Sequence, residues 1–483
     1  MADRQMIAGR GTFRAMLALG VAMGLALGAA NSAQAQVRTL TDALALTYAT
    51  NPGLLAARAQ LRAVDENVPQ ALAGWRPQVT ISANAGYIEG TSQSYIRPTI
   101  VSPGRTLESN ALRGTNVESL TVTQPLFRGG ATRANTFRAE NQVMAQRASL
   151  IGTEQTAFTN AVNAYVSVIQ STQVLALNIN NEQVLSRQLQ ATRERFRVGE
   201  ITRTDVAQAE AALAGATATR QSAEGDLQVA RSAFLQVIGD PAPDRLSEPQ
   251  PLRLPVRSID EARGLAGSNN PTVIAALFND AAAKDNFDIQ YARLMPNLSL
   301  QGSIARNEDV QTKDLTTKVG QVLMVLSIPL YQGGAEYAAI RQARQQQQQT
   351  RQQVDDARRQ AIQQVTQAWN TYVTAKATID STREQIRSNE IALEGVQREA
   401  IVGSRTTLDV LNAEQTLLNS RVTLVRNLAS LINASYAVAA ASGRLTARDL
   451  NLPVPMYDET AYYKAVRNRL IGTGDYATDQ PGR

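Results

Sequence analysis

The sequence predicts a mainly α-helical chain with two β-hairpins, in which one structural unit is built twice. Three observations support this fold class. Residues Pro125–Gly130 return 204 positions later as Pro329–Gly334, with the same Pro-Leu-aromatic-x-Gly-Gly pattern. No proline occurs from 131 to 198 or from 335 to 402, so each stretch can form an uninterrupted helix. Four segments of about ten residues, the length of a tilted membrane strand, lie beside these helices.

The repeat divides the chain into two units, residues 36–257 and 258–450. Each unit is expected to contain a helix, a β-hairpin, a long helix and a shorter return helix. In the first unit we expect the hairpin at 78–127, the long helix at 131–198 and the return helix at 205–238. In the second unit the corresponding ranges are 297–331, 335–402 and 409–442. Fifteen extra residues between Pro77 and Pro125 predict a loop that is free to grow. A proline-rich linker joins the units, and residues 451–483 form a weakly patterned tail that we expect to be partly ordered.

The N-terminus has the pattern of a secretory signal. Arg4, Arg10 and Arg14 precede an apolar run from Ala15 to Ala30, and small residues then lead to an expected cleavage after Ala35. Residues 1–35 are therefore expected to be a signal peptide. Its removal takes away three arginines and one aspartate, so the formal charge falls from +6 to 6 − 3 + 1 = +4. A small positive excess without stacking aromatics argues against nucleic-acid binding.

The composition argues against an enzyme. The chain contains no cysteine and no histidine, which excludes thiolate nucleophiles, imidazole bases, the usual zinc ligands and disulfides. No nucleophile elbow, phosphate loop or metalloprotease motif occurs. We therefore expect no catalytic residues, no metal and no cofactor.

The four short segments are candidates for membrane strands. After residue 36 no segment is apolar enough to cross a bilayer as a helix, so a membrane-embedded chain would need strands closed into a barrel. The segments are 78–87, 117–127, 297–304 and 319–331. They form two expected hairpins, with polar loops at about 88–116 and 305–318. Phe127 and Tyr331 lie at matching ends, where aromatic rings favour the membrane interface. The alternative is a soluble hairpin that packs on a helix.

Four strands cannot close a barrel, because single-chain barrels need about eight or more. The barrel is therefore expected to be shared between chains. Two chains would supply eight strands and three would supply twelve, and the residues alone leave both possibilities open.

The long helices carry heptad repeats of large and small residues. Large residues recur every seven positions as Val365, Tyr372, Ile379, Ile386 and Leu393, with Ala361, Ala368 and Ala375 four positions earlier. The first copy repeats the pattern at Ala161, Val168, Leu175 and Leu189. This period predicts a coiled-coil seam with closely packed helices. At about 1.5 Å per residue each long helix would reach roughly 100 Å.

A glycine is expected to end each long helix. Gly199 and Gly403 suit the left-handed C-cap position, and Asp205 and Asp409 then open the return helices. For Asp205 a purely structural role is an open alternative, because an aspartate followed three residues later by Gln208 predicts an N-cap with a capping box.

These features together resemble the TolC family of outer-membrane efflux proteins. The resemblance covers residues 37–450 and depends on the signal peptide, the duplicated hairpin-and-helix unit, the strand ending in Gln-Pro-Leu-Phe-Arg-Gly-Gly and the turn Val-Gly-x-x-Thr-x-x-Asp-Val. It implies a homotrimer with a twelve-stranded barrel in the lipid of the outer membrane, continued by a helical tunnel across the periplasm. It also implies an exit duct for type I protein secretion or multidrug efflux, joined by a periplasmic adaptor to an inner-membrane ABC or proton-driven pump.

The resemblance also implies roles for residues at the two helix turns. Asp205, Arg405 and Asp409 match charged positions of the periplasmic constriction. Asn412 stands where relatives have a second acidic residue, and Ala400 where they have a latch tyrosine. The adaptor would dock on the turns through Val198, Gly199, Thr202, Val402, Gly403 and Thr406. Thr202 and Thr406 either contact the adaptor or only cap the turn. For Asp409 the pore role is favoured, since Arg405 lies four residues away as a partner.

A secreted coiled-coil scaffold or adhesin without a channel is the main alternative. It would explain the heptads and the signal peptide. It would not explain paired segments of alternating polarity that recur beside the helices.

Overall fold

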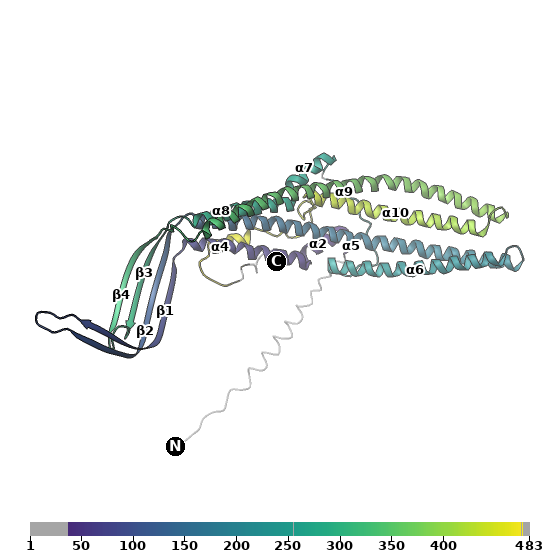
Figure 1. The fold of residues 1–483 in the computed structure, drawn as a ribbon. Coiled ribbons are helices and arrows are strands. Elements are labelled where there is room, and N and C mark those ends of the chain that lie inside the picture. Colours follow the sequence, from purple (N-terminus) through teal and green to yellow (C-terminus); the bar gives the residue numbers. More distant parts are fainter. Residues whose placement is uncertain (1–36, 255, 475, 477–483) are drawn as a thin grey trace, which may run out of the picture.

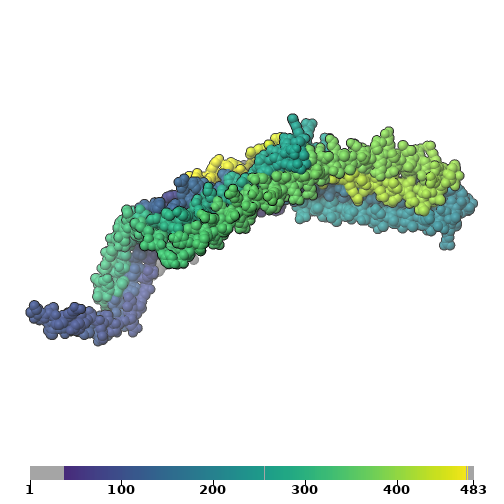
Figure 2. Space-filling view, turned by 45° about the horizontal axis from the view of Figure 1, so that its top comes forward, coloured from purple at the N-terminus to yellow at the C-terminus, as the bar shows by residue number. Residues whose placement is uncertain are grey.

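The computed structural model describes residues 37–254, 256–474 and 476, so the expected signal peptide lies outside the described residues. The chain is elongated and bent, with a β-sheet at one end and a bundle of long helices that extends to the other (Figures 1 and 2). The four antiparallel strands and the mainly helical content that the sequence predicts are confirmed.

One antiparallel sheet contains all four strands in the order β1-β2-β3-β4. The strands are β1 (Gln78–Ile96), β2 (Arg105–Arg128), β3 (Asn297–Glu308) and β4 (Thr316–Ser327). The two hairpins, far apart in the sequence, pair through β2 and β3, from Asn116 opposite Glu308 to Arg128 opposite Asn297. Strands β1 and β4 are therefore the edges of the sheet within the chain.

The predicted limits of the hairpins are wrong in two places. The polar loop expected at 88–116 is mostly strand, because β1 and β2 stay paired as far as Ile96 opposite Arg105. Main-chain hydrogen bonds continue this two-stranded ladder beyond the end of β3 without any need for alternating polarity. The extension projects away from the rest of the sheet (Figure 1). At the other end β4 stops at Ser327, so Tyr331 lies outside the strand.

The helical end consists of two antiparallel helix pairs. The long helices α5 (Ala131–Arg197) and α9 (Ala335–Ile401) have 67 residues each, and the return helices are α6 (Arg203–Ile238) and α10 (Thr407–Ala441). Helix α5 packs against α6, α9 packs against α10, and α10 also packs against α5. Most of the predicted heptad residues are buried, among them Ala161, Val168, Leu189, Ala361, Val365, Ala375, Ile379 and Leu393.

Shorter helices pack beside the long ones, from the middle of the molecule to the sheet (Figure 1). They are α2 (Leu40–Thr50), α3 (Pro52–Asp65), α4 (Asn67–Leu72), the 3₁₀ turn η1 (Ala73–Trp75), α7 (Ile259–Asn269), α8 (Pro271–Ala292) and α11 (Ala461–Val466). Both Asn51 and Asn270 cap a helix that has proline at its first position, as the shared Asn-Pro sequence favours. Among the described residues no helix is both long enough and apolar enough to cross a membrane.

The main core joins the N-terminal helices, the long helices and the C-terminal segment. Phe158, Tyr165 and Phe234 are fully buried in it, together with Leu445 and Leu452 beyond α10. The Tyr165 hydroxyl donates to the carbonyl of Arg38 or of Ser247, 2.9 and 2.8 Å away. The tail is therefore packed on the helices more extensively than its weak pattern suggested.

A buried arginine connects α2, α3 and the tail. The guanidinium of Arg58 lies 4.5 Å from the ring centre of Tyr48 and 5.2 Å from that of Tyr457, and it donates to the Tyr48 carbonyl at 3.1 Å. A cation that stacks between two aromatic rings while it donates to a carbonyl can be buried without loss of its favourable contacts.

A buried carboxylate nearby is in a less favourable position. The side chain of Asp65 is fully buried, and neither of its oxygens has a hydrogen-bond partner within the described part of the chain. Burial raises the pKa of Asp65 to about 7, against the opposing effect of Arg147. At pH values between the ordinary pKa of an aspartate and about 7, Asp65 therefore holds a proton in the folded state that it has released in the unfolded state.

Replacement of Asp65 by Asn should stabilise the protein at pH 8 and remove part of its pH dependence. The free energy of unfolding of the native chain should fall as pH rises from 4 to 7, since folding then has to take up a proton. At roughly 1.4 kcal/mol per pKa unit, the effect is on the order of a few kcal/mol. Thermal unfolding at pH 5 and pH 8 measures it, with the exposed Asp226→Asn as a control. An unchanged pH dependence in Asp65→Asn would contradict this assignment.

Candidate functional site

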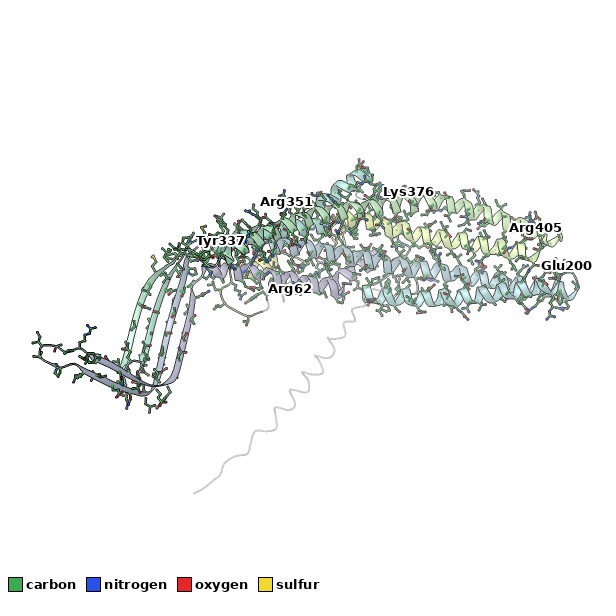
Figure 3. The ribbon with its side chains drawn as sticks, in the orientation of Figure 1. Arg62, Glu200, Tyr337, Arg351, Lys376 and Arg405 are labelled. Atoms are coloured by element: carbon green, nitrogen blue, oxygen red, sulfur yellow. The ribbon has the colours of Figure 1, made fainter. Side chains whose placement is uncertain are left out.

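The predicted site residues gather at the two helix turns, at the end of the bundle farthest from the sheet. Residues 198–202 join α5 to α6, and residues 402–406 join α9 to α10. Glu200 and Arg405 mark this end (Figure 3). Within the described structure no hydrogen bond or ion pair joins the first turn to the second, so each turn is held by its own residues.

Both turns end the long helix in the same way. Gly199 has φ +79° and Gly403 φ +82°, a left-handed conformation that glycine adopts without steric cost. The amide of Gly199 donates to the carbonyl of Phe196 at 2.9 Å, and the next amide donates to the carbonyl of Arg195 at 2.9 Å. The second turn repeats these bonds from Gly403 to Ala400 and from Ser404 to Glu399. This pair of bonds is the Schellman motif, and it confirms the expected glycine caps.

Threonine, not aspartate, caps each return helix. The hydroxyls of Thr202 and Thr406 accept hydrogen bonds from the amides of Asp205 and Asp409, both at 3.3 Å. Each aspartate accepts in return from the threonine amide, at 2.9 and 3.0 Å. The prediction that Asp205 is the N-cap, with Gln208 in the capping box, is wrong by three residues. Threonine takes the extended conformation that an N-cap needs, and the aspartate three residues later reaches back to its amide.

The capping bonds keep both aspartates ionised. The hydrogen bond from the Thr202 side chain is the main cause of the lowered pKa of Asp205. For Asp409 the backbone bond from Thr406 lowers the pKa most, followed by the bond from its side chain. A carboxylate that accepts several hydrogen bonds favours its charged form. Both carboxylates therefore carry a negative charge at neutral pH.

Arg405 has a different partner from the one that the sequence suggests. Its Nε donates to Oε2 of Glu399 at 2.9 Å, in the last turn of α9, and its expected bond to Asp409 is not formed. In the first turn Arg195 on α5 pairs with Glu200 in the loop at 2.6 Å. An ion pair thus joins helix and loop in each turn. In the first turn the arginine lies on the helix and the glutamate in the loop, and in the second turn these positions are reversed. Both pairs are solvent-exposed, so they orient side chains more than they stabilise the fold.

Exposed apolar side chains also lie on the turns. Val198 and Val402 are 77% and 78% exposed, and Ile401 is 77% exposed. Asn412 is exposed one turn into α10, whereas Ala400 is buried. The sequence reasoning named the two valines through their repeat. It missed Ile401, because the first copy has Arg197 at the equivalent position. It also missed Glu200 and Glu399, whose equivalents in the other copy are Ser404 and Arg195, because the repeat does not retain these residue types.

The sheet has one apolar face, and its opposite face is polar on β1 to β3 but carries Leu323 and Val325 on β4. Ile81, Leu120 and Ile304 are register partners on the apolar face, where Val322 and Met324 are 73% and 68% exposed. The opposite face of β1 to β3 carries Thr80, Ser82, Ser119, Thr121, Gln301 and Ser303. Such extensive exposure of apolar side chains on one face requires a covering partner or lipid.

Aromatic residues stand at both ends of the apolar face. Phe127, opposite Leu298, is 50% exposed at the end nearest the helices. Tyr87, on the same face of β1, is 72% exposed at the other end. Tyr331 is 78% exposed but lies beyond β4, so it flanks the sheet from the connection to α9. The sequence reasoning missed Tyr87, although its alternation with Val79 and Ile81 would have identified it.

Comparison with known proteins decides the family. The profile of the family described as "Outer membrane efflux protein" matches residues 27–240 and 263–444. The chain belongs to this family. It is similar to the outer membrane efflux protein BepC of Brucella suis, with 35% identity over 465 residues that cover 95% of this chain and 97% of the relative. It is also similar to the outer membrane protein TolC of Escherichia coli, with 24% identity over 491 aligned positions and coverage of 96% and 95%.

A solved structure supports the fold. The outer membrane protein VceC of Vibrio cholerae superposes with a TM-score of 0.70 at 22% identity, over 84% of this chain and 96% of that chain. The TolC-like fold is thereby confirmed. As a member of this family, the chain is an efflux or secretion channel of the outer membrane of Gram-negative bacteria and not an enzyme. The scaffold or adhesin alternative is set aside.

Replacement of Thr406 by Ala should loosen the second turn and leave the first intact. The variant loses the hydroxyl that accepts from Asp409, at a typical cost of about 1 kcal/mol for an N-cap. Hydrogen exchange of amides 403–410 should accelerate about fivefold, while amides 199–206 keep their rates. Thr202→Ala is the matched control and should give the reverse pattern. Equal acceleration of both turns would mean that they are coupled rather than independent.

Proposed function

We propose that three copies of the chain form one channel-tunnel, the outer-membrane exit duct of a tripartite export system. Each copy would supply its four strands to a shared twelve-stranded barrel and its helices to a tunnel across the periplasm. The observation that carries this proposal is the four-stranded sheet with a broad apolar face and two edge strands. Four strands are too few to close a barrel, and three copies in cyclic order would pair β4 of each chain with β1 of the next.

The apolar face would meet lipid, and the polar face of β1 to β3 would line the pore. Tyr87 and Phe127 bound the apolar face, as aromatic residues do at the two membrane interfaces. With the sheet in the outer membrane, α5 and α9 would extend roughly 100 Å into the periplasm. The turns would then form the periplasmic tip.

At the tip a periplasmic adaptor would recruit the duct to an inner-membrane pump, either ABC-type or proton-driven. The exposed Val198 and Val402 suit this role, together with Gly199, Thr202, Gly403 and Thr406 around them. Apolar side chains on a rigid, capped turn present a contact surface that needs no reordering on binding. Cargo choice would lie with the pump, so the duct would serve multidrug efflux, type I secretion or both.

The constriction would involve Asp205, Arg405, Asp409 and Asn412. Threefold symmetry would place three Asp409 carboxylates around one axis. Their capping bonds favour the ionised form, so such a ring would attract cations at neutral pH. Asn412, uncharged and exposed, would contribute hydrogen bonds but no charge to the constriction.

Replacement of Asp409 by Asn should weaken cation selectivity of the purified trimer in a planar lipid bilayer. The reversal potential under a tenfold KCl gradient should move toward zero, because each trimer loses three negative charges from the constriction. Thr406→Ala is the control, since it weakens the cap but keeps the carboxylate. Absence of conductance from folded native trimers would reject the proposed three-chain channel-tunnel. Equal selectivity in native protein and Asp409→Asn would reject the carboxylate ring alone.

Replacement of Val402 by Glu should abolish export while the trimer and its conductance remain. A buried, unpaired charge at a docking surface costs more than the lost apolar contact. The measurement is ethidium accumulation in host cells whose own copy of the gene is replaced by the variant. Val229→Glu is the control, because Val229 is 70% exposed on α6 away from the turns. Normal export by Val402→Glu would place the docking surface elsewhere.

A further inference from the structure

A large groove lies midway along the helices, where α10 separates α5 from α9. Its volume is about 890 Å³, and it extends to the N-terminus of α8, where Asn270 and Pro271 reach it. We call this space the mid-helix groove. Helix α10 forms its floor, and polar side chains of α5 and α9 form its walls, including Gln155, Asn163, Gln364 and Gln367.

Uncharged amides and hydroxyls dominate the lining, and one charged side chain stands among them. Of the described residues that line the mid-helix groove, Arg426 on α10 is the charged one. Arg426 is exposed and has neither an ion-pair nor a hydrogen-bond partner in the described part of the chain. By contrast Arg421, five residues earlier on α10, pairs with Glu390 at 2.7 Å. The groove therefore contains a positive charge that no residue neutralises.

Two buried polar atoms in the groove also lack partners. Gln155 is only 6% exposed, and its Nε2 donates to no described residue. The Oδ1 atom of Asn433, on the groove floor, accepts from none. An unmet buried hydrogen-bonding group destabilises the fold unless a ligand or water satisfies it. A free cation and a free amide donor favour an anionic acceptor, and the free amide oxygen favours an N–H or hydroxyl on the same ligand.

The floor of the groove adds an apolar strip. Alanines recur on this face of α10, at Ala429, Ala434, Ala437, Ala440 and Ala441. Small side chains let a flat apolar group approach the helix closely. The groove thus offers a cationic position, hydrogen-bonding walls and an apolar floor, the combination that small-molecule sites commonly have.

The open side of the groove faces away from the core of the chain. On α10, Tyr436 and Ala439 pack into the main core with the terminal segments, and Val438 packs with the cluster around α7. Asn433 and Ala437 lie on the remaining face and line the groove, while Ala429 and Ala440 border both the groove and the main core. If the terminal segments lie on the outside of the proposed trimer, this face borders the tunnel. Access for cargo thus rests on the proposed function.

We infer that the mid-helix groove is a binding site for amphiphilic organic anions that pass through the tunnel. Arg426 supplies the charge for a carboxylate, Gln155 and Asn433 supply a donor and an acceptor, and the alanines of α10 receive an apolar group. Three such sites in a trimer would form a belt that holds anionic cargo inside the tunnel. The belt lies far along the helices from the acidic turns.

The test uses dansylglycine, a fluorescent carboxylate with an adjacent N–H, and its uncharged amide, dansylglycinamide. Binding to the full-length trimer in amphipol is followed by the rise in dansyl fluorescence. The native protein should bind the acid saturably and at least tenfold more tightly than the amide. Arg426→Gln should weaken binding of the acid about tenfold and leave binding of the amide unchanged. Arg421→Gln, the control on the same helix outside the groove, should bind as the native protein does.

Two further results separate the possible failures. Ala437→Trp, which fills the groove, should abolish binding of both probes while circular dichroism and trimer size stay native. Channel conductance should persist in Arg426→Gln. If the native trimer binds the acid but does not conduct, the proposed function is wrong and the inference about the groove stands. Equal binding of acid and amide, or unchanged binding of the acid by Arg426→Gln, would overturn the inference. No saturable binding by the native trimer would overturn it as well, since a neighbouring chain or solvent then fills the groove.

Discussion

The unclosed sheet is the constraint on which the rest of the molecule depends. Backbone groups at the outer edges of β1 and β4 pair with no other strand among the described residues, and one face exposes Val322, Met324 and other large apolar residues. Both features favour association in water, the open edges by strand pairing and the apolar face by burial of its side chains. The proposed three-chain barrel would resolve both at once, because lipid would cover the apolar face and neighbouring chains would extend the sheet. The position of the helices depends on the sheet, since a pair of glycines precedes each long helix, directly after β2 in the first copy and after five intervening residues beyond β4 in the second.

The long helices need a second support, because a seam of alanines buries little area per residue. The main core provides it near the middle of the molecule, where α2, α3 and the C-terminal segment pack on α5 and α10. Arg58 and Glu154 take part in this support, since Arg58 stacks on Tyr48 and Tyr457 while Glu154 accepts from the amide of Ala447 at 2.6 Å. Polar groups with such specific partners fix one position of the tail more strictly than apolar contact alone would. The turns are thereby left far from the core and exposed on all sides.

Much of this could be predicted from sequence, and the errors have physical causes. The long helices end within one residue of their predicted limits, because proline, glycine and the heptads all signal the same boundaries. The lengths of β1 and β2 were underestimated, because residues 88–96 pair through backbone hydrogen bonds, which require no alternation of polar and apolar residues in the sequence. Arg405 was assigned to Asp409 by its spacing along the chain, but the Schellman turn brings Glu399 nearer. Tertiary geometry of this kind has no local signal. The mid-helix groove had none either, because its lining comes from four helices.

The two turns show how a duplicated unit can diverge without losing its fold. Gly199 and Gly403, Thr202 and Thr406, and Asp205 and Asp409 are retained, because they make the cap bonds on which the backbone depends. Neighbouring positions take part in the caps through backbone atoms, which do not depend on the side chain, so their residue types can change. Arg195 has become Glu399, Glu200 has become Ser404, and Ile201 has become Arg405. The ion pair survives with its polarity reversed, so the two turns present the same shape with different charges. In a trimer the tip would alternate between two chemically distinct turns, and an adaptor could distinguish them by charge alone.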